Sequence, residues 1–337
     1  MIRFGSITSP LEFFARRYVG FLSVLLTLVG FPSSEVVSQT WTAFHPTIAP
    51  VTALTVSHDG KRILIGSQEG TVSLDADRLD NATIFKSQIR NVHDIRFIPD
   101  GSQLILAGGR PGEEGSTETF AWPDLRPLAS RSDHEDVIYQ ISVAKQGDFV
   151  SASWDGTCKV FRNEKPFVEY KGHSGPVLSA VWLDDNQSVA SCGLDQTIQV
   201  WDSQTGQRIR SLDNHTDTVH CLALKPQVVA NGTTWLASAG EDRTIRFWQP
   251  TIGRMVRFIK LPKTARAIVW LPDGSRLLAA CDDRVLRSIN PETLAIAESP
   301  LPENTGMPYR LLLSTDGKSI YIGCSRGIGK WNLRDQS

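Results

Sequence analysis

The chain has 337 residues with 35 basic and 36 acidic side chains, and its net charge of -1 lacks the basic excess that nucleic-acid binding requires. Hydrophobic residues make up 41% of the chain and nine residues are tryptophan, which excludes an intrinsically disordered protein. A repeat array can reach this length as one domain, because it grows by adding units to the same core.

Residues 1–38 differ in chemistry from the rest of the chain. Three arginines precede an apolar run from Tyr18 to Phe31, and the small residues around Ser38 are spaced as a signal peptidase requires. The run is 14 residues long, against roughly 20 for a spanning helix. We expect a cleaved signal peptide and export to the periplasm or the extracellular space. The alternatives are an uncleaved membrane anchor formed by residues 18–31, which would tether a cytosolic scaffold, and a buried helix.

Residues 39–337 repeat one strand pattern seven times: apolar, any, any, apolar, any, apolar. The seven matches begin at Val51, Val92, Ile138, Val177, Val219, Ala265 and Pro308. Asp-Gly pairs follow several of them and predict tight hairpin turns. These pairs recur after 41 residues from Asp59 to Asp100 and after 43 from Asp273 to Asp316, a period typical of propeller blades. The sequence therefore predicts an all-β fold, a seven-bladed β-propeller of four-stranded antiparallel blades.

The ends of the repeat region predict how the ring closes. The segment from Gly329 to Leu333 matches the third strand of the last blade, and no fourth strand follows it. Residues 39–44 alternate polar and apolar side chains and belong to no blade of their own. We expect this N-terminal strand to complete the last blade, so that no sheet edge is left open at the seam.

One segment of the second blade interrupts the pattern. Residues 108–115 contain four glycines, a composition that disfavours a strand. We expect a mobile loop between the second and third strands of this blade.

The three middle blades carry the sharpest motif. A Gly-His pair opens the fourth blade at Gly172, a Ser and an Asp lie four residues apart in its second hairpin, and the pair Trp201-Asp202 ends its third strand. The chain resembles the WD-repeat family of G-protein β-subunit-like propellers, and in particular secreted bacterial members of that family. The resemblance weakens toward both ends, where the first, sixth and seventh blades keep only part of the motif.

The resemblance implies a role for the repeated polar residues. In WD-repeat propellers, the His, Ser, Asp and Trp of one blade form a buried hydrogen-bonded tetrad. The implied tetrad residues here are His134, Ser151 and Asp155; His173, Ser191, Asp195 and Trp201; and His215, Ser238, Asp242 and Trp248. The third blade has Phe161 in place of the Trp, so its network is expected to stop short. A Ser, His and Asp that recur in successive blades favour this structural role over a catalytic triad, which needs one exposed nucleophile.

Exposed residues around the entrance of the central channel are the expected binding surface. The candidates are Tyr139, Leu178 and His220 at the heads of first strands and Trp154, Leu194 and Glu241 in the turns after second strands. Aromatic side chains dominate the binding energy of protein interfaces, so Trp154 is the expected anchor. The alternative is that Trp154 packs against a neighbouring blade.

The sequence favours a non-enzymatic scaffold that binds another protein or peptide, with a monomeric propeller. No metal-binding or cofactor-binding motif is present, so we expect neither a metal nor a cofactor. The alternative is a secreted propeller enzyme, such as a lactonase or hydrolase, with its site in the channel. Its only evident ionisable residues are Glu241, Asp282 and Arg284. The five cysteines have no paired spacing and are interpreted as small apolar strand residues with free thiols.

Overall fold

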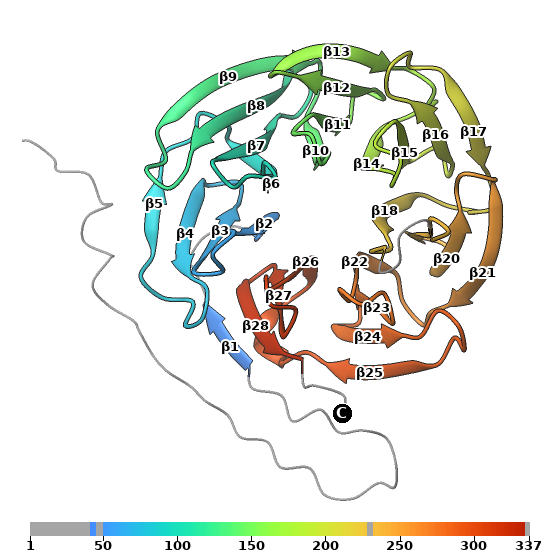
Figure 1. Ribbon diagram of the computed structural model, residues 1–337. Helices are drawn as coiled ribbons and strands as arrows, with labels where there is room; N and C mark the ends of the chain where they lie inside the picture. Colours follow the sequence, from blue (N-terminus) through green and yellow to red (C-terminus); the bar gives the residue numbers. More distant parts are fainter. Residues whose placement is uncertain (1–40, 45–49, 228–231, 334–337) are drawn as a thin grey trace, which may run out of the picture.

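The computed structural model describes residues 41–44, 50–227 and 232–333, and these form a ring of seven four-stranded antiparallel sheets (Figure 1). The predicted seven-bladed propeller is confirmed. Blades 1 to 7 are numbered by their innermost strands in chain order. The proposed signal peptide, residues 1–38, and the alternative anchor, residues 18–31, lie outside the described residues. Within the described ranges, no helix is long and apolar enough to cross a membrane.

Each blade runs from an innermost to an outermost strand. Blades 1 to 3 contain β2 (Ala53–Val56), β3 (Arg62–Gly66), β4 (Thr71–Asp75) and β5 (Thr83–Phe85); β6 (Asn91–Phe97), β7 (Gln103–Arg110), β8 (Glu114–Ala121) and β9 (Pro127–His134); and β10 (Ile138–Val143), β11 (Phe149–Ser153), β12 (Cys158–Arg162) and β13 (Lys165–Tyr170).

Blades 4 and 5 contain β14 (Val177–Trp182), β15 (Ser188–Gly193), β16 (Ile198–Asp202) and β17 (Arg208–Leu212); and β18 (Val219–Leu224), β19 (Leu236–Gly240), β20 (Thr244–Gln249) and β21 (Arg254–Lys260). Blades 6 and 7 contain β22 (Ala265–Trp270), β23 (Leu277–Cys281), β24 (Val285–Ile289) and β25 (Ile296–Pro300); and β26 (Pro308–Leu313), β27 (Ser319–Cys324), β28 (Gly327–Asn332) and β1 (Trp41–Phe44). A short 3-10 helix, η2 (Glu303–Thr305), precedes β26.

Burial decreases from the middle strands to the rim of the ring. Every residue of β11, β19 and β23 is buried, and these strands are rich in Ala, Ser, Leu and Val. The outermost strand β17 exposes four of its five residues. Blades pack face to face through their apolar residues. Two tryptophans at the ends of innermost strands also form hydrogen bonds to the neighbouring blade. Trp182 Nε1 donates to Ser142 O and Trp270 Nε1 to Ala223 O, both at 3.0 Å.

The Asp-Gly hairpin turns are confirmed. Their glycines have left-handed φ values of 71°, 73°, 67° and 68°, at Gly60, Gly101, Gly274 and Gly317 in that order. These φ values lie in the region that glycine adopts without steric cost. The preceding aspartate caps the turn from the side chain; for example, Asp59 Oδ1 accepts the Lys61 N–H at 3.0 Å.

The seam between blade 7 and blade 1 closes as the sequence predicted. Strand β1 pairs antiparallel with β28, with Trp41 opposite Trp331 and Phe44 opposite Ile328, and Figure 1 shows β1 at the outer edge of that blade. Residues 39 and 40 of the predicted N-terminal strand lie outside the described residues. The N-terminal strand therefore covers the edge that β28 would otherwise expose.

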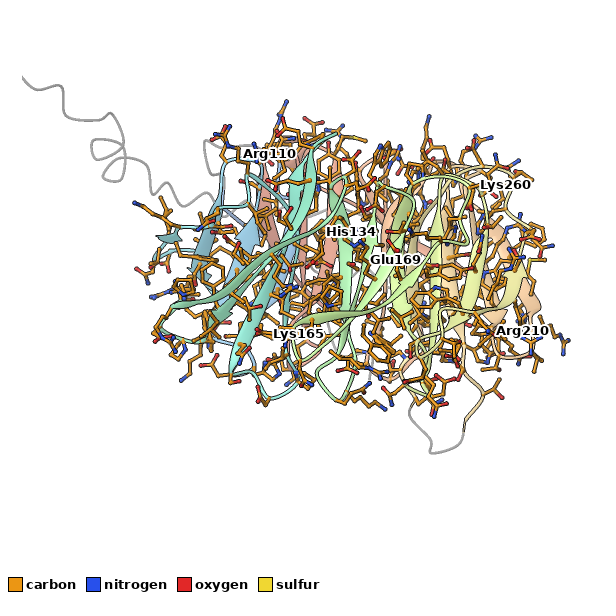
Figure 2. The ribbon with its side chains drawn as sticks, turned by 90° about the horizontal axis from the view of Figure 1, so that it is seen from above. Arg110, His134, Lys165, Glu169, Arg210 and Lys260 are labelled. Atoms are coloured by element: carbon orange, nitrogen blue, oxygen red, sulfur yellow. The ribbon has the colours of Figure 1, made fainter. Side chains whose placement is uncertain are left out.

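The Gly-rich segment of blade 2 is a strand pair, not the predicted loop. Strand β7 continues through Gly108 and Gly109 to Arg110, and β8 begins at Glu114, so the turn is residues 111–113. A Cβ at Gly108 would lie 1.8 Å from Asn91 O, and one at Gly109 would lie 2.1 Å from Glu114 O. A side chain at either position would collide with a backbone carbonyl of the adjacent strand, so only glycine fits. Figure 2 places Arg110 at one face of the disc, with Lys165 at the opposite face.

All five cysteines are free, and four of them are buried: Cys158, Cys192, Cys281 and Cys324. Burial raises the pKa of the Cys221 and Cys324 thiols to about 12 and that of Cys281 to about 11. At neutral pH these groups are uncharged thiols with little nucleophilic thiolate.

Candidate functional site

Blades 4 and 5 each hold a chain of four hydrogen-bonded side chains. In blade 4, His173 Nδ1 lies 2.8 Å from Asp195 Oδ2 and its Nε2 lies 2.8 Å from Ser191 Oγ, to which Trp201 Nε1 donates at 3.1 Å. The corresponding distances in blade 5 are 2.9, 2.7 and 2.8 Å, among His215, Asp242, Ser238 and Trp248. A carboxylate can only accept, so Nδ1 donates to the Asp and Nε2 accepts from the Ser hydroxyl.

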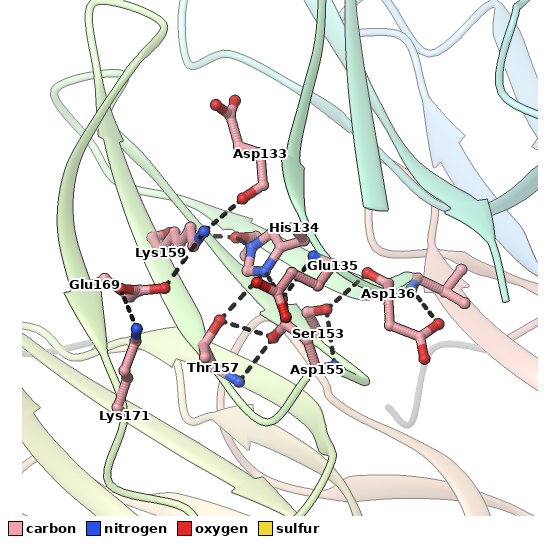
Figure 3. Close-up of polar contacts among 12 residues, drawn as sticks. Asp133, His134, Glu135, Asp136, Ser153, Asp155, Thr157, Lys159, Glu169 and Lys171 are labelled. Carbon is pink, nitrogen blue, oxygen red and sulfur yellow. Dashed lines mark hydrogen bonds and ion pairs between the residues drawn. The ribbon is translucent and has the colours of Figure 1, made fainter. Parts of the chain in front are cut away.

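Blade 3 has the same chain without its last member. His134 Nδ1 and Nε2 each lie 2.7 Å from their partners, Asp155 Oδ2 and Ser151 Oγ. Phe161 stands where the Trp would be and stacks on Phe149 with ring centroids 4.5 Å apart. Figure 3 shows Asp155 bonded also to Thr157, which fixes the turn that carries the carboxylate.

Blades 2 and 6 lack the tetrad and use a buried charge in its place. Both charges occupy the third-strand position that faces the tetrad serine in blades 3 to 5. In blade 2, Glu118 accepts the Ser87 hydroxyl at 2.6 Å and the Gln88 N–H at 3.0 Å. In blade 6, the guanidinium of Arg287, which is only 2% exposed, donates to both oxygens of Asp283 at 2.9 and 2.7 Å. Both were missed from the sequence, because only the His, Ser, Asp and Trp positions of the tetrad were followed.

The tetrads lack the features of a catalytic triad. The side chains of His173 and His215 are 0% exposed, and Ser191 and Ser238 are fully buried. Burial alone would raise the pKa of Asp195, but hydrogen bonds from His173 and from nearby backbone N–H groups outweigh it and lower that pKa. Burial lowers the pKa of His215 more than Asp242 raises it. The serine oxygens are thus held out of reach of any substrate.

A β-bulge near the start of the innermost strand, in blades 2 to 7, builds the mouth of the channel. The register with the second strand skips one residue in each blade. The skipped residues are His93, Tyr139, Leu178, His220, Arg266 and Tyr309. Together with Thr52 of blade 1 and Arg310 they line a pocket of about 240 Å³. We refer to this pocket as the channel mouth.

The sequence placed only part of this site. Tyr139, Leu178 and His220 line the channel mouth, whereas Trp154, Leu194 and Glu241 do not. Four of the missed residues, Thr52, His93, Arg266 and Tyr309, occupy the first variable position of the repeated strand pattern, and Arg310 occupies the second. Comparing the first variable position across all seven blades would have found those four, but not Arg310.

An aromatic stack crosses from the channel mouth to the surface. The ring of His93 stacks on Tyr139 at 4.8 Å, and Tyr139 stacks on Trp154 at 5.3 Å. Trp154 is 38% exposed, and its backbone N–H donates to Val137 O at 2.9 Å. It therefore packs against its own blade with part of its ring and faces solvent with the rest.

The opposite side of the mouth is a charged network. His220 Nε2 lies 2.5 Å from Glu241 Oε2, and Arg266 contacts the same oxygen at 3.1 Å. Arg266 also donates to both oxygens of Asp282 at 2.8 and 2.7 Å. Arg284, the remaining residue of the enzyme alternative, donates to Glu303 O. Leu194 is partly buried and bonds through its N–H to Pro176 O at 3.0 Å.

The family model "WD domain, G-beta repeat" matches residues 125–162, 164–202 and 206–249. These three segments are WD repeats, and they lie within the seven-bladed β-propeller. Each matched unit begins with the outermost strand of one blade, or just before it, and continues through the three inner strands of the next. The three units end in blades 3, 4 and 5, which are the blades with the hydrogen-bonded His, Ser and Asp.

Two curated proteins match part of the chain. The chain is 31% identical over 175 residues to "U3 small nucleolar RNA-associated protein 15 homolog" of Gallus gallus, a match that covers 50% of this chain and 33% of that protein. It is 29% identical over 148 residues to "Guanine nucleotide-binding protein subunit beta-1" of Caenorhabditis briggsae, with 42% of each chain covered. The matched part of this chain thus spans less than half the length of these two relatives.

A solved structure supports the fold across nearly the whole ring. The WD40 β-propeller domain of Doa1 superposes with a TM-score of 0.73 at 18% identity and covers 88% of this chain and 96% of that one. Among the residues that the structure describes, no group of three or more His, Cys, Asp or Glu side chains is arranged to hold a metal ion.

The stability of this propeller is expected to fall as the pH decreases from 6.5 toward 4. Burial and the nearby positive charge of Arg310 lower the pKa of His93 to about 4, whereas unfolded histidine titrates near 6.5. The unfolded chain therefore binds more protons in this window, and each such group reduces the unfolding free energy by up to about 1.4 kcal/mol per pH unit. His215 acts in the same direction.

Urea unfolding at several pH values between 7 and 4.5 checks this. The slope of the unfolding free energy against pH is expected to be smaller in His93→Gln than in the parent protein, because glutamine cannot take up a proton. An identical slope in the variant and the parent protein would show that His93 is not the titrating group.

Proposed function

We propose that this protein is a non-enzymatic scaffold that binds a partner protein through the face around the channel mouth. The observation that carries the proposal is the stack of His93, Tyr139 and Trp154, which presents a partly exposed tryptophan beside a pocket. Aromatic anchors of this kind, next to a cavity and surrounded by polar groups, dominate the energy of protein interfaces.

The distribution of exposed apolar side chains favours this face. Among the large hydrophobic residues exposed in the described ranges, only Trp154 lies in a turn between second and third strands. Ile252 lies in the turn between β20 and β21, and six others lie singly on outermost strands, one per blade in blades 1 to 6: Ile84, Leu128, Phe167, Ile209, Phe258 and Ile296. Spaced around the circumference, these residues form no continuous patch, and single exposed apolar residues are ordinary on protein surfaces.

The polar side of the mouth fits a non-enzymatic role. Glu241 and Asp282 both accept from Arg266, which occupies the carboxylates that the enzyme alternative would use as general bases. The network instead suits a polar rim, where it would orient a partner without chemistry.

Replacing Trp154 by Ala is expected to weaken partner binding by about 2 kcal/mol, roughly thirtyfold. The change should leave the melting temperature almost unaltered, because the Trp154 ring is partly exposed and stacks on Tyr139 near the surface. The partner is first captured with the propeller and identified by mass spectrometry. Its dissociation constant is then measured with the purified proteins.

The control is Gln227→Ala in the hairpin that leaves β18. The Gln227 side chain bonds to Asp184 and lies away from the turns that carry Trp154. Neither binding nor melting should change in this variant. Normal binding together with early melting in Trp154→Ala would show that Trp154 is a packing residue.

We further propose that the protein is exported, with residues 1–38 removed as a signal peptide. The basic segment, the short apolar run and the small residues before Gln39 support this. Sequencing the N-terminus of the mature protein separates export from anchoring through residues 18–31: a start near residue 39 supports export, and an intact N-terminus contradicts it.

A further inference from the structure

Arg310 places a cation in the channel mouth without a matching carboxylate. Its guanidinium donates to two backbone carbonyls, Tyr309 O at 3.2 Å and His93 O at 3.1 Å. Among the described residues, no Asp or Glu oxygen lies within ion-pair distance of it. A guanidinium has five donors in a planar fork, so two carbonyls leave donors available.

The sequence of the neighbouring blades explains why this cation faces the pocket. In blades 2, 3 and 4 the residue after the bulge accepts a backbone N–H of the next blade, through Asp94, Gln140 and Ser179 at 3.0, 2.9 and 3.2 Å in turn. Arg310 occupies this position in blade 7, and a guanidinium cannot accept. It extends past blade 1, where Thr52 and Ala53 are small, and reaches the carbonyl of His93 in blade 2.

The carboxylates near the mouth already have partners. Asp94 acts on Arg310 from a distance, but its oxygens bind the Ile141 N–H and Arg96 at 3.0 and 3.2 Å. Glu241 and Asp282 are neutralised by Arg266 on the other side of the ring. Burial lowers the pKa of Arg310 although the charge of Asp94 raises it. The mouth therefore offers a positive charge to an incoming anion.

The rest of the pocket limits the size and shape of what enters. Tyr139, Leu178 and Tyr309 supply aromatic and apolar walls, and Thr52 supplies a hydroxyl. The volume of about 240 Å³ is below the roughly 300–1,000 Å³ of sites that hold cofactors or drug-sized ligands. A single side chain or a chain end fits this space better than a whole small molecule.

We propose that the channel mouth binds a carboxylate of the partner, inserted as one acidic side chain that pairs with the Arg310 guanidinium. This rests on the proposed function, and it adds the chemistry of the group that the partner presents. The apolar walls would cover the methylene groups of the inserted residue, and exclusion of water would strengthen the charge-assisted hydrogen bonds. The stack that ends at Trp154 would contact the residues next to it.

Three blocked amino acids serve as probes, and each is titrated into the whole protein while the Arg310 side-chain and His93 ring resonances are followed by NMR. N-acetylglutamate amide carries a side-chain carboxylate, N-acetylglutamine amide is its neutral isostere, and N-acetylglycine carries a terminal carboxylate. We expect saturable binding of blocked glutamate, at least tenfold tighter than of blocked glutamine. Tighter binding of N-acetylglycine than of blocked glutamate would overturn the side-chain assignment and show that the pocket binds a terminal carboxylate.

Two arginine variants make the test specific. Arg310→Gln should weaken blocked glutamate at least tenfold, and Arg310→Lys, which keeps the charge and loses the fork, should weaken it less. Arg284→Gln, the same change at an exposed arginine of the same face outside the pocket, should bind as the parent does. Equal affinity for the glutamate and glutamine probes, or unchanged binding in Arg310→Gln, would overturn the proposal.

Failure of this inference is distinguishable from failure of the proposed function. If Trp154→Ala leaves partner binding intact while the probes bind at Arg310, the scaffold surface is wrong and the carboxylate pocket stands. If Trp154→Ala weakens partner binding while the probes do not bind at Arg310, the proposed surface is supported and the proposed carboxylate pocket is wrong.

Discussion

Deleting residues 1–44 is expected to destabilise the propeller severely, whereas deleting residues 1–38 is expected to leave its stability unchanged. Strand β1 supplies the fourth strand of blade 7 through four paired residues along β28. At about 1 kcal/mol per backbone hydrogen bond, the ladder alone contributes about 4 kcal/mol. That is a large part of the 5–15 kcal/mol that typically stabilises a domain. Loss of β1 also exposes the edge of β28, which favours aggregation.

Thermal unfolding and light scattering of the two truncated proteins check this. Other contacts across the seam remain in both, including the Tyr321 hydroxyl on Ala76 O at 2.8 Å and the Lys330 ammonium on Asp77 at 2.8 Å. Because these are common to the two proteins, any difference between them belongs to the strand. Equal melting temperatures and equal solubility would contradict the role of β1 in closing the ring.

Replacing Asp195 by Ala should cost about 3 kcal/mol of unfolding free energy, at the upper end of the usual cost of leaving a buried partner unpaired. The carboxylate is 4% exposed and accepts from the His173 ring, from the Ser174 and Thr197 N–H groups and from the Thr197 hydroxyl. All of these donors lose their acceptor together. A loss of this size corresponds to a fall in melting temperature of roughly 6 °C or more.

Asp195→Asn is the matched control, because it keeps one carbonyl acceptor and the shape of the side chain. Its loss should be clearly smaller. Phe161 makes blade 3 a second comparison: Asp155→Ala should cost less than Asp195→Ala, since the network there ends at Ser151. Full stability of Asp195→Ala, together with loss of a hydrolytic activity, would contradict the structural role of the tetrad.

The propeller could be predicted from sequence because its signals are local and repeated. The strand pattern starting at Val177, for instance, records which residues of β14 are buried. The closure of blade 7 by the N-terminal strand was predictable, because the last blade lacked a fourth strand and the first strand belonged to no blade. The glycines at 108 and 109 misled the prediction. Glycine disfavours an isolated strand, but here a Cβ would collide with a carbonyl oxygen of the neighbouring strand.

The candidate site was predictable only in part, because it depends on contacts between distant blades. The pairing of Asp283 with Arg287 lies within one blade and four residues, yet its role is visible only once the missing tetrad is known. The reach of Arg310 to His93 O spans 217 residues of sequence. No local pattern encodes that contact, since it depends on the small side chains of blade 1 and on the closed ring.

The bulges near the starts of the inner strands also bear on how such a ring can acquire new specificity. A residue that the ladder skips has no opposite partner in the second strand, so changing its side chain need not disturb strand pairing. Six blades place one such position at the mouth, and the side chains there already range from Leu178 to Arg266. Randomising these six codons together would produce a library that varies the recognised ligand while the scaffold stays constant. The same separation would let natural descendants of one ring diverge in what they bind faster than in how they fold.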